Sequence, residues 1–188
     1  DMAKIVLSDA PQRFAVAGFS MGGYIALEML RQAPERITRL ALLDTTARDD
    51  TKVKARARID AIDACEKGQF ADVIQGMIPI LLHPDHQKTP LTDFVLKMAA
   101  RVGSDAFVRR HQAMQSRKDS RKLISSCDIS VRAICGRQDA MCSLEEHEEI
   151  ADLARYGRLS IIEECGHMTI LERPHAATAL LRDWLIYD

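Results

Sequence analysis

The sequence predicts an α/β protein with a mostly parallel sheet, flanked by helices and interrupted by a helical insertion. Short apolar runs typical of buried strands alternate with amphipathic helical segments near both ends of the chain. Between them, residues 48–126 have helical periodicity and no convincing strands. The 188 residues, 47% hydrophobic and 28% charged, have the composition of an ordinary globular protein. We therefore expect one compact α/β domain with an insertion.

Residues 2–7 have the sequence expected at the end of a helix, and the first α/β unit follows them. Residues 13–19 are apolar and rich in strand formers, which predicts a strand buried on both faces. Residues 21–31 place apolar side chains three and four positions apart, and Pro34 follows, so a helix is expected there. Residues 38–44 predict a second buried strand that ends in polar residues.

The insertion, residues 48–126, is interpreted as a helical cap between two parts of the core, residues 1–47 and 127–188. Glycines and a serine at helix boundaries predict helices over residues 50–67, 91–101 and 105–116. The predicted cap holds 15 Lys and Arg against 10 Asp and Glu, whereas the remainder of the chain is acidic. This excess either solvates helix surfaces, the interpretation we favour, or attracts an anionic substrate.

The α/β alternation resumes after the insertion. Strands are expected at residues 131–136 and 158–163, and helices at 144–156 and 174–187, the last with an apolar stripe of helical period. Four strands make a thin sheet under a large cap, and the first of them would be an exposed apolar edge. We therefore expect the natural protein to be longer, with further strands before residue 1.

A tight turn between the first strand and the first helix carries the motif GFSMG, residues 18–22. A G-x-S-x-G sequence in this place is typical of a nucleophile elbow, where Ser20 takes a strained backbone conformation that exposes its hydroxyl. Close packing of the turn requires small neighbours, and Gly18, Gly22 and Gly23 supply them.

A serine nucleophile needs a histidine base and a carboxylate that orients it, in the chain order Ser, Asp or Glu, His. Asp139 follows the third predicted strand and His167 the fourth. Parallel strands end at one edge of a sheet, so we expect Ser20, Asp139 and His167 to meet there. Glu163 and Glu164 are rival acids, but they lie too near His167 in sequence to reach the far side of its ring.

Five stretches of the core occur together in order: VAGFSMGGY at residues 16–24, LLD at 42–44, GRQD at 136–139, GH at 166–167 and LERP at 171–174. In these stretches the chain resembles the α/β-hydrolase fold superfamily, in the cap-bearing group of esterases, 3-oxoadipate enol-lactonase-like proteins and carbon–carbon bond hydrolases. The resemblance implies Ser20 as nucleophile, His167 as base and then acid, and Asp139 as the residue that fixes the imidazole tautomer.

The resemblance also implies an oxyanion hole, of which this sequence supplies half. The backbone N–H of Met21 is the expected first donor. The second donor in such proteins comes from a loop after an earlier strand, and this chain has no such loop. We expect that donor in a segment before residue 1.

These residues predict a serine hydrolase that cleaves a small ester, thioester or lactone through an acyl-enzyme. One alternative is hydrolysis of a carbon–carbon bond in a ring-cleavage product by the same triad. Another is a non-catalytic ligand-binding protein on the same fold. The expected partner is a small-molecule substrate, and no cofactor is implied. The sequence leaves the substrate and the oligomeric state open.

Several other classes are disfavoured. A net charge of −1 argues against a nucleic-acid binder, and no apolar run approaches the ~18 residues that cross a bilayer. The five cysteines are scattered without a C-x-x-C pair, which argues against disulfides and structural zinc. We expect a soluble cytoplasmic protein with no metal, because His83, Asp85 and His86 read as a polar loop.

The remaining candidates are expected to be structural. Cys142 and Cys165 are not expected to take part in catalysis. The other histidines of the helical segments, His111, His147 and His175, are expected at the surface or at helix ends. The apolar residues of the cap are more simply its own core than the lining of a substrate pocket.

Overall fold

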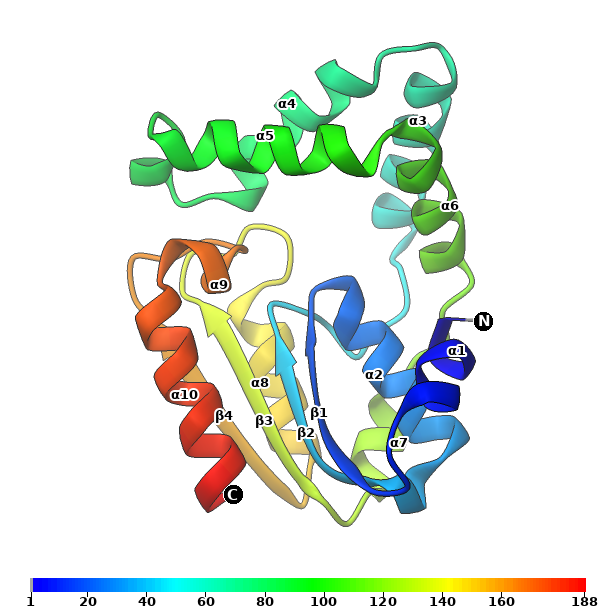
Figure 1. The fold of residues 1–188 in the computed structure, drawn as a ribbon, viewed down its shortest axis with the longest axis vertical. Coiled ribbons are helices and arrows are strands. Elements are labelled where there is room, and N and C mark those ends of the chain that lie inside the picture. Colours follow the sequence, from blue (N-terminus) through cyan, green and yellow to red (C-terminus); the bar gives the residue numbers. More distant parts are fainter. Residues whose placement is uncertain (1) are drawn as a thin grey trace.

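The computed structural model describes residues 2–188, and a four-stranded parallel sheet lies at its centre (Figure 1). The strands lie side by side in chain order: β1 (Phe14–Phe19), β2 (Ile37–Leu43), β3 (Ser130–Gly136) and β4 (Tyr156–Ile162). Val16 pairs with Leu40, and Leu40 with Val131. The predicted parallel sheet is confirmed, and its strands end at one edge.

Helices cover both faces of the sheet, which explains why the strands are apolar along their length. On one face, α1 (Met2–Asp9), α2 (Met21–Gln32), α7 (Arg121–Ser126) and α8 (Leu144–Leu153) enclose a core that includes Leu30, Leu40 and Ile150. On the other face, α10 (Pro174–Tyr187) packs Ala177 and Trp184 against Leu43 and Ile134. The short helix α9 (Thr169–Glu172) precedes α10.

Four helices of the insertion stand above the carboxyl ends of the strands (Figure 1). They are α3 (Lys52–Glu66), α4 (Phe70–Leu81), α5 (Pro90–Val102) and α6 (Ser104–Gln115). Two short 3-10 turns, Pro34–Arg36 and Pro84–His86, complete the described elements. Separate apolar clusters around Ile78 and Phe107 hold these helices together. The helix α7 lies within the predicted cap, residues 48–126, but it packs on α8 in the core. The end of the cap at residue 126 therefore stays a prediction.

The predicted helices have boundaries within two residues of the observed ones, with one larger difference. The helix that starts at Leu144 ends at Leu153 rather than at residue 156, and Tyr156 already belongs to β4. The tight reversal needs Gly157, because a Cβ there would overlap the carbonyl oxygen of Ala151. The helix expected from residue 105 starts at Ser104 instead. None of the helices in residues 2–188 has the length and apolarity to span a bilayer.

Candidate functional site

Ser20 sits at the sharp turn between β1 and α2 with φ 51° and ψ −117°. A positive φ is costly for a residue with a side chain, and the surroundings hold it in place. The Ser20 N–H donates to the Leu43 carbonyl at 2.8 Å, and the Thr45 hydroxyl donates to the Ser20 carbonyl at 2.9 Å. The strained turn is thus tied to the end of β2.

The glycines around this turn differ in importance. A Cβ on Gly18 would overlap the backbone of Gly22, and one on Gly23 would lie 2.6 Å from the Thr45 side chain. Apart from its chain neighbours and the backbone of its own helix, a Cβ on Gly22 would meet no described atom within 4 Å. Close packing therefore explains Gly18 and Gly23, and the expectation that Gly22 also serves it was wrong.

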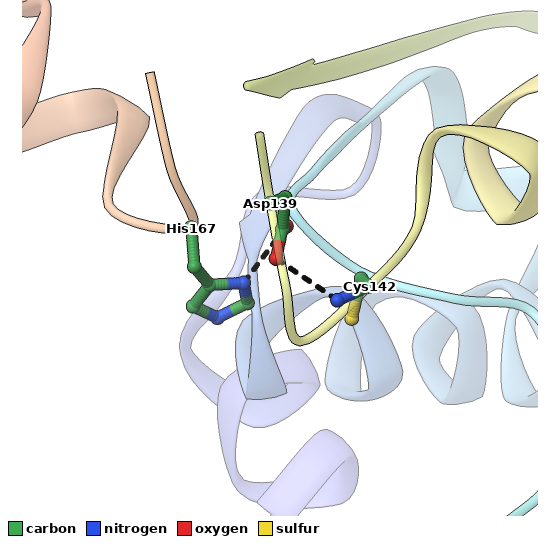
Figure 2. Close-up of side chains that lie close together, drawn as sticks. All are labelled: Asp139, Cys142 and His167. Atoms are coloured by element: carbon green, nitrogen blue, oxygen red, sulfur yellow. Dashed lines mark hydrogen bonds and ion pairs between the residues drawn. The ribbon is translucent and has the colours of Figure 1, made fainter. Parts of the chain in front are cut away.

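The structure brings Ser20, His167 and Asp139 together at the carboxyl edge of the sheet. His167 Nδ1 lies 2.9 Å from Asp139 Oδ2 (Figure 2). On the other side of the ring, His167 Nε2 lies 2.8 Å from Ser20 Oγ. Asp139 Oδ1 accepts the N–H groups of Met141 and Cys142 at 2.8 and 2.9 Å. A carboxylate only accepts, so Nδ1 carries the hydrogen and Nε2 accepts the Ser20 hydroxyl.

Met21 is the first residue of α2. The N–H groups in the first turn of a helix have no partner within the helix, and the helix dipole makes that end partly positive. The Met21 N–H therefore suits an oxyanion that forms next to Ser20 Oγ.

The two glutamates that precede the histidine have other partners. Glu163 makes an ion pair with Arg137 at 2.6 Å, and Glu164 pairs with Arg173 at 3.0 Å. Both carboxylates are largely exposed. Of the three acids considered from the sequence, Asp139 is the one in contact with the His167 ring.

Glu172 holds the loop that carries His167, a role that the sequence did not indicate beyond its place in the LERP stretch. One carboxylate oxygen accepts from Gly166 N–H at 2.9 Å and from Met168 N–H at 3.3 Å. The other contacts His83 N at 2.8 Å and His86 Nδ1 at 2.6 Å. The Glu172 side chain is fully buried, so this carboxylate fastens the histidine loop to the insertion.

His147 was expected at the surface or at a helix end; it lies in the first turn of α8, but it is not at the surface. The residue is 0% exposed, behind the triad. Its Nε2 accepts the Thr45 N–H at 3.0 Å, and its Nδ1 donates to the Ser143 carbonyl at 2.8 Å. These partners fix the neutral ring, because a charged ring would have no acceptor to offer Thr45. Burial lowers the pKa of His147 below its ordinary 6.5.

The buried His147 predicts a loss of stability in mild acid. The unfolded chain takes up a proton near pH 6.5 and the folded chain only at a lower pH, so the free energy of unfolding falls as the pH drops through that interval. The slope that one histidine contributes is at most about 1.4 kcal/mol per pH unit. Urea unfolding of wild type and His147→Gln between pH 5 and 7.5 measures it. The variant is expected to show a shallower slope, and the exposed His175→Gln the wild-type slope; equal slopes in all three would contradict the assignment.

Two buried groups have the composition of metal sites: Asp139 with Cys142 and His167, and Asp44 with Asp139 and His147. In the first, both ring nitrogens of His167 are already engaged, and burial raises the pKa of the Cys142 thiol far above its ordinary value. A neutral thiol is a poor ligand. In the second, the ring of His147 is committed to two backbone groups. The hydrogen bonds of these residues account for the close approach of their side chains in both groups.

The apolar residues of the insertion mostly pack on one another. Ile74, Phe107 and the partly buried Met77 form one cluster, and Ile78 and Met98 belong to another. The first cluster is a core of the insertion, whereas the second also includes Met168, with Phe19 packed against it, and so joins the insertion to the rest of the protein.

Comparison with known proteins gives concordant results. A family model described as "alpha/beta hydrolase fold" matches residues 10–174. A pimeloyl-[acyl-carrier protein] methyl ester esterase of Neisseria meningitidis serogroup C is 23% identical over 175 residues, which are 90% of this chain and 68% of that protein.

Solved structures show the same fold. A thermophilic esterase from Thermogutta terrifontis superposes with a TM-score of 0.89 at 24% identity, over 98% of this chain and 69% of the other. The enol-lactonase from Burkholderia xenovorans LB400 gives a TM-score of 0.85 at 19% identity, over 98% and 70%.

Proposed function

The chain belongs to the alpha/beta hydrolase fold family and is a hydrolase of that fold, and from this premise we propose that it cleaves a small ester, thioester or lactone through an acyl-enzyme on Ser20. The observation that supports this most is the continuous hydrogen-bonded chain from Ser20 Oγ through the His167 ring to Asp139. Pure ligand binding does not need a buried relay of this kind.

In the proposed reaction, Ser20 Oγ attacks the carbonyl carbon of the substrate while His167 Nε2 takes the hydroxyl proton. The negative oxygen that forms is stabilised by the Met21 N–H. His167 then gives its proton to the leaving alcohol or thiol as the carbon–oxygen or carbon–sulfur bond breaks. Water repeats the sequence on the acyl-enzyme and releases the acid and free Ser20. Asp139 stabilises the charged ring at each stage.

The test is covalent labelling of the purified natural protein with a fluorophosphonate. An activated serine displaces fluoride and forms a stable phosphonyl ester, so intact-mass spectrometry is expected to show one adduct per chain. Ser20→Ala is expected to take up none, and the exposed Ser125→Ala is a matched control that labels fully. A correctly folded wild type that takes up no label would overturn the proposal.

A panel of simple methyl esters, thioesters and lactones then separates the bond types. Hydrolysis of one of these classes with loss of activity in Ser20→Ala is the expected result. Turnover of a vinylogous 1,5-diketone without ester cleavage would favour carbon–carbon bond hydrolysis instead.

A further inference from the structure

The loop that carries His167, residues 165–168, lies against the turn of the insertion at residues 81–86. The His167 N–H donates to the carbonyl of Leu81, the last residue of α4, at 3.1 Å. The last carbonyl groups of a helix have no partner within the helix, and this bond satisfies one of them. The insertion therefore contacts the backbone of the proposed base directly.

The two segments approach so closely at Gly166 that no side chain fits between them. A Cβ at this position would lie 2.6 Å from the backbone nitrogen of His83 and 2.9 Å from the carbonyl carbon of Leu82. Both are backbone atoms, which cannot swing aside as the end of a flexible side chain does. The turn of the insertion thus limits how far the histidine loop can move toward it.

Glu172 links the two segments through its two carboxylate oxygens. The residues on either side of His167 donate their N–H groups to one oxygen. On the insertion, the N–H of His83 and the Nδ1 of His86 lie 2.8 and 2.6 Å from the other oxygen. A carboxylate only accepts, so Nδ1 of His86 carries a hydrogen. One side chain therefore holds the backbone on both sides of the proposed base to two residues of the insertion.

The burial of Glu172 rules out a direct part in the reaction. Its side chain is 0% exposed, and each oxygen accepts two hydrogen bonds from the protein. A substrate cannot reach a carboxylate that has no accessible surface, so Glu172 influences the reaction only through the groups that it holds. Within the loop that it holds, the His167 ring contacts Ser20 Oγ at 2.8 Å.

We propose that Glu172 is a positioning residue that acts through His167, so that the turn of the insertion at residues 81–86 helps to set the base for proton transfer from Ser20. The inference deepens the proposed hydrolase function and rests on it for its kinetic test. A catalytic group misplaced by about 1 Å can cost about a hundredfold in rate, because proton transfer needs a hydrogen-bonded distance. The insertion is then part of the catalytic machinery as well as a cover over the sheet edge.

Glu172→Gln tests the link with the smallest change in shape. An amide has one oxygen and one NH₂ group, so it accepts for one segment and presents hydrogens to the N–H groups of the other. We expect kcat for ester hydrolysis to fall about tenfold to a hundredfold, with KM within about threefold because no substrate contact is lost. Ile124→Val, which destabilises a core cluster that contains neither segment, is expected to keep the wild-type kcat. A folded Glu172→Gln protein with kcat within about twofold of wild type would overturn the proposal.

Substitutions at His86 give a milder test with a built-in rescue. His86→Leu removes the Nδ1 donor and is expected to lower kcat about fivefold with KM little changed. His86→Asn keeps an N–H donor at the same place along the side chain and is expected to recover most of that loss. His111→Leu is the matched control on the insertion, because His111 contacts the Phe107 carbonyl instead, and it is expected to leave kcat within about twofold. Equal kcat values for the Leu and Asn variants of His86 would refute the positioning contact, and this pair decides if Glu172→Gln does not fold.

Proton NMR of the natural protein with ¹⁵N-labelled histidine gives a readout that does not require turnover. The Nδ1 proton of His167, which is bonded to Asp139, is identified by its absence from His167→Gln. We expect its resonance to shift and its exchange with water to accelerate in Glu172→Gln, and both to stay as in wild type in Ile124→Val. An unchanged resonance in Glu172→Gln would overturn the proposal even if esters are hydrolysed. A failure of the hydrolase proposal has a different signature, namely no fluorophosphonate label and no turnover in wild type, and the shifted resonance would then still support the positioning of the ring.

Discussion

Replacing His167 with alanine is expected to lower kcat for ester hydrolysis by at least about 10⁴-fold. The ring accepts the Ser20 hydroxyl at 2.8 Å, and an alanine side chain leaves no base in its place. Without it, the serine keeps its proton at neutral pH and is a weak nucleophile. Initial rates at saturating substrate measure the effect, with residual fluorophosphonate labelling as a second readout.

The matched control for this change is His175→Ala. His175 is an exposed histidine in the first turn of α10 and contacts neither Ser20 nor Asp139 in any of the hydrogen bonds described above. Its removal is expected to leave kcat within about twofold, as for surface substitutions away from a site. Circular dichroism and a thermal melt check that both variants fold. A folded His167→Ala protein with more than a tenth of the wild-type kcat would contradict the assigned role.

The three triad residues could be predicted from the sequence because their positions depend only on local structure and on strand direction. Ser20 follows β1, Asp139 follows β3 and His167 follows β4. In a parallel sheet all three must emerge at one edge. Their proximity therefore follows from recognition of the strands, without any knowledge of side-chain contacts.

The parts that sequence reasoning missed depend on contacts between distant segments. His147 is buried because its partner Thr45 lies 102 positions away, and neighbouring residues of α8 do not reveal this. Glu172 is buried by His83 and His86 on the insertion, whose position over the sheet was not predictable. The pattern of a short helix shows on which side of the helix a residue lies. Which distant segment packs over that side is known only from the tertiary structure.

Asp44 is the rival that best tests Asp139 as the acid of the triad. It follows β2, and β2 lies next to β3, the strand that precedes Asp139. Asp44 is 0% exposed and has φ 47°. One of its oxygens accepts the Gly136 N–H at 3.2 Å, and the other contacts the Thr169 hydroxyl. Burial raises the pKa of Asp44 well above its ordinary value, and the negative charge of Asp139 adds to the effect. The surroundings of Asp44 therefore favour the neutral acid.

Asp139→Asn is therefore expected to lower kcat by about 10⁴-fold, whereas Asp44→Asn lowers it by less than about tenfold. An amide at position 139 presents an NH₂ or a carbonyl to His167 without the charge that stabilises the imidazolium, and it can impose the wrong tautomer. At position 44 the amide replaces a group that favours its neutral form, so the charge facing the ring changes little. Steady-state rates for both variants, with unfolding curves to exclude loss of structure, make the comparison. The reverse order of effects would move the acid of the triad from β3 to the end of β2.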